Sequence, residues 1–344
     1  MFKLKKLSEV VRTWKFALFV AAVAIIMILP IFERNAFTLR ILALVAVSTV
    51  YASSWNLLAY SGQGSLGHAT FLGIGAFVSS LVAVNLGISA IVGLLVGGLF
   101  AAAVGFLIGL ACVRLKAWFL AMVTFGSSVI AVAVISQFDN ITHGTLGFPP
   151  PRIVPSGLPL YLLTATFAIV SVSTMYIIMK SKMGLAFKAI RENENEARMV
   201  GINTPRYKLL AFVISTFFAG LAGCFYVQTQ GYVDSSLFSA DNSFKPLMMA
   251  VIGGLGTIEG PIIGSTLIVA IDSFLPNIDR YIQPFMGPLF PAVSSVGPPL
   301  RLIGLGLFLI IVVIFLPKGL TSLFHKAYDY FREDTSKAKK NGKT

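Results

Sequence analysis

The sequence carries little charge for its length. Of its 344 residues, 12% are Asp, Glu, Lys or Arg, whereas 56% are hydrophobic. Soluble globular domains have about 25% charged residues, so this composition excludes an ordinary water-soluble enzyme. Because a helix crosses a bilayer with about 20 mainly apolar residues, the chain has room for about ten crossings. We therefore expect an all-α protein, a polytopic transmembrane helical bundle.

Cysteine and histidine are also scarce. Cys112 and Cys224 both lie in apolar runs, where a free thiol behaves as a small hydrophobic group. His68, His143 and His325 are far apart in the sequence and show no zinc-binding spacing. The sequence therefore predicts neither a disulfide nor a metal site, and it lacks the convergent groups that a membrane enzyme requires.

A nucleotide-binding motif is missing as well. Residues 342–344 read Gly-Lys-Thr, as at the end of a P-loop, but Lys337 stands where that motif has its first glycine. We expect no ATP site in this chain and no cofactor bound by it.

Acidic residues are outnumbered, with 14 Asp and Glu against 27 Lys and Arg. A net charge of +13 is typical of nucleic-acid-binding proteins, yet the basic residues gather in three segments that a bilayer explains, 1–15, 180–208 and 317–344. The positive-inside rule places such segments in the cytoplasm. We therefore expect both termini to be cytoplasmic and no nucleic-acid partner.

Apolar runs predict the membrane spans. Seven are clear, at about 16–32, 41–60, 68–84, 88–112, 118–137, 160–179 and 209–228. The first run follows a basic start, as in a signal peptide, but no small-residue cleavage site comes after it, so we interpret it as a retained span.

The last third of the transmembrane domain 16–316 requires a helix break. One crossing over 244–271 followed by one over 300–316 would leave the basic tail outside, against the charge rule. A break in the glycine-rich segment 253–261 restores an internal tail and gives about ten segments, with an outer loop at 272–299. Irregular backbone at membrane depth must be buried in protein or line a wet cavity. Full crossings and a re-entrant hairpin both fit this pattern.

Small residues recur at every fourth position of the predicted span 88–112. They are Gly93, Gly97, Ala101, Gly105 and Gly109. In lipid, such a stripe allows the close backbone approach that drives helix association. We expect the stripe to pack inside the bundle, and a subunit interface is the alternative.

Two glycine-rich stretches, 60–76 and 251–265, place polar side chains beside helix breaks. The candidate residues of a translocation path are Gln63, His68, Gly253, Gly254, Gly256 and Glu259. An ionisable group at membrane depth indicates a functional site, and broken helices in transporters present their ends to the substrate. The alternative is that His68 and Glu259 cap helix ends in water at the membrane interface.

These two stretches and the segment 191–223 together resemble the permease subunits of branched-chain amino acid ABC importers. The segment begins Arg191, Glu192, Asn193, Glu194 and continues in the order typical of that family. The resemblance spans nearly the whole chain, and the length and outer loop are more similar to the LivM-type than to the shorter LivH-type subunit. Gly64 and Asn195 depart from the pattern, which more often has a larger apolar residue and Ala there.

The resemblance implies a heteromeric importer in a bacterial or archaeal cytoplasmic membrane. Its expected partners are a second, LivH-like permease, two cytoplasmic ATPase subunits that bind ATP and Mg, and an extracytoplasmic solute-binding protein. The expected solutes are branched-chain or related amino acids. Urea or a short amide is an alternative, and a stand-alone secondary transporter is another, although most spans lack the ionisable residues that such a transporter needs.

Among the predicted cytoplasmic loops, the loop 180–208 is the one long enough to bind an ATPase subunit. The resemblance implies a short coupling helix at about 184–201. Its expected contact residues are Glu192, Glu196, Ala197, Gly201 and Asn203. The alternative is a solvated charged loop that only sets the topology.

Overall fold

The computed structural model describes residues 35–112, 115, 117–144 and 146–274. It also describes residue 30 and, near the end of the chain, residues 304, 306, 307, 310, 314 and 319–322. The predicted segments 1–15 and 16–32, most of the outer loop, most of the last span and most of the tail lie outside the described residues.

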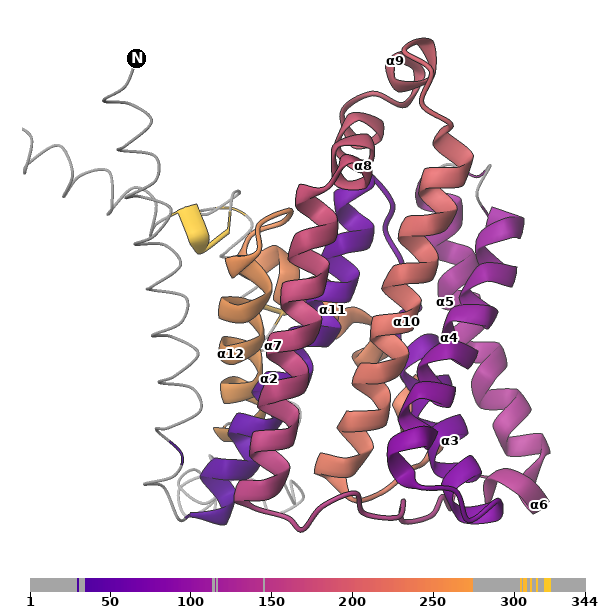
Figure 1. Ribbon diagram of the computed structural model, residues 1–344, viewed down its shortest axis with the longest axis vertical. Coiled ribbons are helices and arrows are strands. Elements are labelled where there is room, and N and C mark those ends of the chain that lie inside the picture. The colour runs from indigo at the N-terminus through magenta and orange to yellow at the C-terminus, as the bar shows by residue number, and fades with distance from the viewer. Residues whose placement is uncertain are drawn as a thin grey trace, which may run out of the picture.

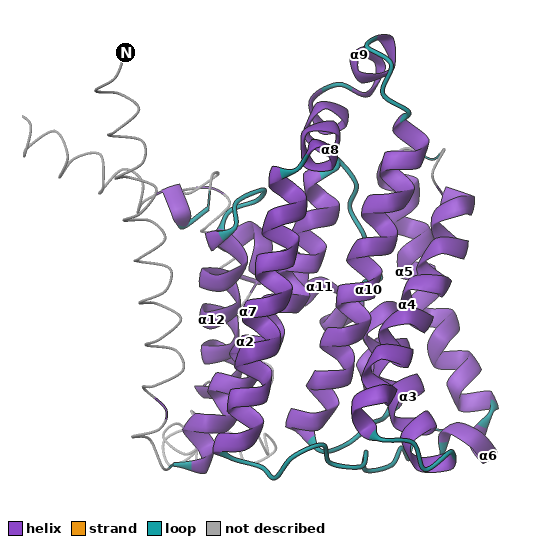
Figure 2. Ribbon diagram, in the orientation of Figure 1, coloured by secondary structure: helices purple, strands orange, loops and turns teal. Residues whose placement is uncertain are grey.

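Helices make up the described part of the chain (Figures 1 and 2). They are α2 (Ala36–Tyr60), α3 (Ala69–Asn85), α4 (Ala90–Cys112), α5 (Ala117–Gln137), α6 (Asp139–Thr142), α7 (Leu158–Lys180), α8 (Lys182–Glu192), α9 (Glu194–Met199), α10 (Thr204–Gln230), the 3-10 helix η1 (Ser235–Phe238), α11 (Ala240–Gly253) and α12 (Glu259–Phe274). Within these ranges the extended pairing is limited to an isolated antiparallel bridge between Phe148 and Val233.

Five of these helices, α2, α4, α5, α7 and α10, are long and apolar enough to cross a membrane. The apolar helix α3 is shorter, with 17 residues. These six helices lie within a few residues of the predicted spans, which confirms the all-helical membrane class.

Local sequence signals set the ends of the long helices. The Asn35 side chain accepts a hydrogen bond from the Phe37 amide at 3.0 Å and caps α2. The Asn203 side chain accepts one from the Arg206 amide at 3.3 Å and caps α10, which ends at Gly231 with a φ of 78°. The asparagine side chains and the glycine turn provide hydrogen-bond partners for backbone groups that a helix end would otherwise leave unpaired.

Two helices, α2 and α10, hold the bundle together. Helix α2 packs against α7, α10 and the pair α11 and α12, whereas α10 packs against α2, α3 and α4. Figure 1 shows α8 and α9 beyond one end of the bundle, which we call the loop end. At the opposite end, α2 and α7 begin and α10 finishes.

The small-residue stripe of α4 faces the inside of this bundle. All five of its residues are buried. A Cβ atom added at Gly97 would lie 2.5 Å from the Gly75 carbonyl oxygen of α3, and one at Gly105 would overlap Thr216 of α10. The other face of α4 exposes Leu95, Leu99 and Leu107, among others. The stripe therefore packs α4 onto α3 and α10 and leaves the apolar side chains for lipid.

Glycines of the first glycine-rich stretch serve the same purpose. A Cβ atom at Gly75 would overlap the backbone of Gly220, and one at Gly67 would overlap the Thr124 carbonyl. Helix α3 therefore crosses α10 and meets α5 at distances that exclude larger side chains.

We predict that Gly97→Val destabilises the bundle, because the added group would meet both the Gly75 carbonyl oxygen and the Cys224 sulfur at 2.5 and 2.8 Å. Overpacking of this kind costs about 1–3 kcal/mol or more, which thermal unfolding of the purified chain in detergent will detect. Gly126→Ala on α5 is the control, since no atom lies within 4 Å of its added Cβ. An unchanged unfolding temperature for the Gly97 variant would contradict the packing assignment.

Candidate functional site

The second glycine-rich stretch forms an antiparallel hairpin of two helices. Helix α11 ends at Gly253 and α12 begins at Glu259, so the predicted helix break is confirmed. A Cβ atom at Gly253 would overlap the backbone of Gly260, and one at Gly264 would overlap the backbone of Met249. Glycine therefore lets the two halves approach closely on either side of the tip, residues 254–258.

A buried amide on α2 holds the hairpin tip. The Asn56 side chain accepts a hydrogen bond from the Gly256 amide at 2.8 Å and donates one to the Thr257 carbonyl at 2.7 Å. Asn56 is 2% exposed. Asn56 thereby supplies partners for two backbone groups of the tip, and the Thr257 hydroxyl, which donates to the Gly254 carbonyl and accepts from the Gly260 amide, serves two more. Asn56 is not among the residues predicted from the sequence, although an amide side chain within an apolar span is a signal that could have identified it.

An ion cluster joins the two helices of the hairpin away from the tip. The Lys245 ammonium lies 3.0 Å from a carboxylate oxygen of Asp241 and 3.2 Å from one of Asp272. The side chains of Lys245, Asp241 and Asp272 are 16%, 32% and 18% exposed. Mutual pairing is the usual way in which such charges are accommodated inside a bundle.

The two halves of the hairpin differ in depth. The Tyr51 hydroxyl, well inside α2, donates to the Asn242 carbonyl at 2.9 Å, so α11 begins partway along the bundle. Helix α12 instead runs beside α2 until Phe274 meets Phe37, with ring centroids 6.4 Å apart. Thus α12 runs along α2 as far as its first turn at Phe37, whereas α11 starts inside the bundle.

The first glycine-rich stretch follows α2 and carries Gln63. The Gln63 amide nitrogen donates to the Ser61 hydroxyl and to the Lys208 carbonyl, both at 2.9 Å. Gln63 is buried. Its amide group therefore ties the end of α2 to the first turns of α10.

His68 is completely buried at the start of α3. Its Nε2 atom lies 3.0 Å from the Ser54 hydroxyl, and its ring lies between Tyr51 and Phe71, with centroids 5.4 and 6.0 Å away. Its side chain makes no capping hydrogen bond to α3. The alternative of a histidine that caps a helix end in water is therefore wrong for His68, because three neighbouring side chains exclude solvent.

Glu259 lies in the opposite environment. It is exposed and begins α12, where the helix macrodipole favours an acidic side chain. The two ionisable candidates from the glycine-rich stretches are thus not brought together: one is enclosed by protein and the other faces outward.

The loop at 180–208 contains two short helices, α8 and α9, and the single helix expected over 184–201 is a wrong prediction. The Asn193 side chain accepts hydrogen bonds from the amides of Asn195 and Glu196 at 3.0 and 3.3 Å, which ends α8 and starts α9. Helix α8 buries Phe187 and Ile190 against the bundle and is therefore amphipathic.

The five expected contact residues of this loop have different surroundings. Glu192 and Glu196 are exposed, whereas Ala197 is buried. Gly201 has a φ of 88° and turns the chain between α9 and α10, and Asn203 caps α10. Glu192 and Glu196 therefore present their side chains to solvent, whereas Ala197, Gly201 and Asn203 determine the conformation of the loop.

Glu194 organises the junction between α9 and α10. Its carboxylate accepts hydrogen bonds from Arg198 at 2.5 Å and from Thr204 at 3.1 Å, and it forms an ion pair with Lys208. Burial acts to raise the pKa of Glu194, but the contacts with Lys208, Arg198 and Thr204 outweigh it and hold this pKa below its ordinary value. Because Lys208 also accepts the hydrogen bond from Gln63, the cluster continues into the first glycine-rich stretch.

Arg191, at the end of α8, touches both glycine-rich stretches. Its guanidinium lies 5.3 Å from the centroid of the Tyr60 ring. A Cβ atom at Gly62 would lie 3.1 Å from the Arg191 Cα, and one at Gly256 would lie 2.7 Å from a guanidinium nitrogen. Both glycines have positive φ, 78° and 74°. The turn after α2 and the hairpin tip therefore both contact the same residue of the loop, Arg191.

Apolar side chains are exposed on the same loop. Met199 is 85% and Val200 77% exposed at the end of α9, and Leu185 of α8 is also exposed. Met199 and Val200 are adjacent in sequence, so two large apolar side chains are exposed together at the end of α9. Sequence analysis did not select these residues, because their short apolar run has no periodicity of its own.

We predict that Asn56→Ala loosens the hairpin tip, because it leaves the Gly256 amide and the Thr257 carbonyl without their partner. The cost is about 1–3 kcal/mol for each group, which should accelerate hydrogen exchange at residues 254–258. Asn140→Ala, an exposed position on α6, serves as the control. Equal exchange rates in the two variants would contradict the role of Asn56.

Known proteins resemble this chain over most of its length. The family model described as the branched-chain amino acid transport system permease component matches residues 37–313. The high-affinity branched-chain amino acid transport system permease protein LivM of Escherichia coli is 28% identical over 308 residues, which cover 80% of this chain and 72% of LivM. The LivH permease protein of the same organism is 37% identical over 89 residues, 26% of this chain and 28% of LivH.

A solved structure, PsaBC from Streptococcus pneumoniae in complex with Fab, has a TM-score of 0.47 and 17% identity, covering 85% of this chain and 96% of that chain. The family model covers far more than half of the sequence, from the start of α2 to beyond α12. The chain therefore belongs to the family of permease components of branched-chain amino acid transport systems.

Proposed function

We propose that this chain is the membrane-spanning permease subunit of an ATP-driven importer for branched-chain or related amino acids. The observation that carries the proposal is the contact of Arg191, on the 180–208 loop, with both glycine-rich stretches. A chain without an ATP motif needs an external source of energy, and a loop joined to both helix breaks is suited to deliver it.

The complete importer contains two cytoplasmic ATPases that bind ATP and Mg, a LivH-like second permease and an extracytoplasmic solute-binding protein. Similarity to both LivM and LivH proteins supports the paired permeases. The membrane is the cytoplasmic membrane of a bacterium or archaeon.

The loop end faces the cytoplasm in this proposal. The basic residues of 180–208 gather there, as the positive-inside rule requires. The Leu320 amide donates to the Ile252 carbonyl at 2.9 Å, beside the hairpin tip, so the tail starts at the same end. With further spans at 16–32 and 300–316, the described helices make about ten segments, and both termini are cytoplasmic.

The exposed part of α8 and α9 binds an ATPase subunit. Met199 and Val200 supply an apolar centre, and Glu192 and Glu196 supply a charged rim, which is the usual anatomy of a protein interface. The buried or capping residues of the loop, Ala197, Gly201 and Asn203, fix the shape that the ATPase recognises.

Movement of this loop reaches the translocation path through two routes. Arg191 contacts the turn after α2 and the hairpin tip, and the Glu194–Lys208 pair leads to Gln63. The path then runs along the surfaces of the two breaks and opens to alternate sides as the helix groups rock. Gly253, Gly254 and Gly256 let the tip move, Gln63 and His68 position the first break, and Glu259 is the exposed acid that can meet an ammonium group.

We predict that Arg191→Ala uncouples the assembled importer. The guanidinium contacts with Tyr60 and Gly256 disappear, so transport per ATP hydrolysed should fall about tenfold, equivalent to about 1.4 kcal/mol of coupling free energy. Transport and ATP hydrolysis are measured together in proteoliposomes. Lys182→Ala, an exposed position at the start of the same helix, is the matched control. A wild-type ratio in the Arg191 variant would refute the link.

We predict that Met199→Ser with Val200→Ser removes the ATPase from the complex in a detergent pull-down, and that charge reversal at Glu192 and Glu196 does the same. These side chains are exposed, so the unfolding temperature of the permease should change little, although the charge reversals also remove the Lys188–Glu192 ion pair and the Asn193–Glu196 hydrogen bond. Leu146→Ser, an equally exposed apolar position near α6, is the control and should retain the ATPase. Retention of the ATPase by the loop variants would rule out this contact surface.

A further inference from the structure

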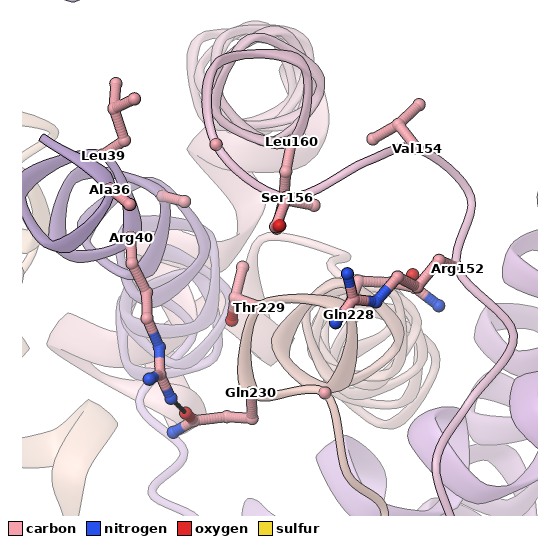
Figure 3. Close-up of a pocket in the computed structure, with 13 residues that line it drawn as sticks. Ala36, Leu39, Arg40, Arg152, Val154, Ser156, Leu160, Gln228, Thr229 and Gln230 are labelled. Atoms are coloured by element: carbon pink, nitrogen blue, oxygen red, sulfur yellow. Dashed lines mark hydrogen bonds between the residues drawn. The ribbon is translucent and has the colours of Figure 1, made fainter. Parts of the chain in front are cut away.

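A cavity of about 250 Å³ opens at the end of the bundle opposite to the loop. It lies between the start of α2, the segment before α7 and the end of α10 (Figure 3). The side chains that concern its chemistry are Arg40, Arg152, Ser156, Gln228, Thr229 and Gln230. None of them belongs to the helix breaks or to the loop.

The two arginines are held by glutamines of α10. The Arg40 guanidinium donates to the Gln230 side-chain oxygen at 2.6 Å. Gln228 accepts a hydrogen bond from the Ile153 amide at 3.2 Å and donates one to the Pro151 carbonyl at 3.0 Å, which fixes the backbone on both sides of Arg152. Figure 3 shows Arg40 and Arg152 on opposite sides of the cavity, with Thr229 between them.

The charge of this cavity is unbalanced. At this end of the bundle Lys245 is paired with Asp241 and Asp272. Among the residues that the structure describes, no acidic side chain lines the cavity, and neither Arg40 nor Arg152 forms an ion pair. The proposed topology puts this end outside, where the positive-inside rule disfavours basic residues. Two guanidinium groups on one small cavity therefore require a reason other than topology.

A carboxylate supplies that reason. The planar guanidinium matches a carboxylate with two parallel hydrogen bonds, and charge-assisted bonds of this type are about twice as strong as neutral ones. The hydroxyl and amide groups of Ser156, Thr229 and Gln230 add further donors beside the arginines.

We propose that this cavity binds a carboxylate on the outer face of the permease, through Arg40 and Arg152. A cavity of this size suits a small molecule, so the carboxylate is that of the free solute. That this solute is an amino acid rests on the proposed function, whereas the carboxylate chemistry rests on the cavity alone.

The test uses the assembled complex in nanodiscs and isothermal titration calorimetry with three probes. Leucine carries a carboxylate and an ammonium, isocaproate carries only the carboxylate, and leucinamide carries only the ammonium. Docking of the solute-binding protein is measured on the same samples. The variants are Arg40→Gln, Arg152→Gln and their combination, with Arg40→Lys and Arg152→Lys as charge-retaining versions. Ser136→Ala, exposed on α5, is the control.

The proposal expects leucine and isocaproate to bind and leucinamide not to bind. The double glutamine variant should weaken both carboxylates about tenfold or more, and the lysine variants by less, because they keep the charge but lose the paired hydrogen bonds. If no solute binds but docking of the solute-binding protein weakens in the double variant, the arginines meet that protein instead, and the proposal is overturned.

Three other results would overturn the proposal. The first is a double glutamine variant that binds solutes and the solute-binding protein as the wild type does. The second is binding of leucinamide as tight as that of leucine. The third is binding of inorganic phosphate in place of isocaproate. If isocaproate binding depends on the two arginines while the complex transports some other solute, the proposed solute fails and the carboxylate site remains.

Discussion

Where a chain leaves its helical hydrogen-bond pattern against other helices, its backbone amides and carbonyls must find other partners, and this constraint governs both helix breaks. At the hairpin tip the partners come from Asn56 of α2. At the turn after α2, Gln63 bridges to the Lys208 carbonyl of α10. Neither break is therefore a loose loop. The hairpin tip is held by a side chain of α2, and the first break is joined to α10 by its own Gln63, so that each break is connected to another helix.

The two sides of the bundle are held by different forces. Helices α3, α4 and α10 approach through small residues such as Gly75, Gly97 and Gly220, and such close packing resists sliding. The hairpin instead packs against α2 through a buried apolar cluster that includes Ala52, Ile252 and Ile268, is tied to α2 by the Asn56 hydrogen bonds, and is closed by the Lys245 ion cluster. Arg191 of the loop contacts this second side at the hairpin tip. In the proposed mechanism, the hairpin moves against the firm block of α3, α4 and α10.

Local features of the sequence were predictable, and long-range contacts were not. Apolar runs gave the long helices, because their length is set by the bilayer, and clustered glycines gave the hairpin break. The roles of Asn56 and Arg191 depend on partners far away in the chain; Asn56 and Gly256 are 200 residues apart. The division between α8 and α9 did have a local signal, since Asn193 followed by Glu196 is a capping pattern. The burial of His68 had none, because Ser54 and Tyr51 of another helix create it.

Electron-spin distance measurements on the assembled importer test the central claim most directly. Labels at Lys188 on α8 and Leu255 at the hairpin tip report on the loop and the break, and a label at Leu107 on α4 marks the firm block. If the loop drives the break, ATP binding will leave the distance from 188 to 255 unchanged and alter the distance from 255 to 107. A distance from 255 to 107 that is the same with and without ATP, while 188 moves away from 255, would contradict the account.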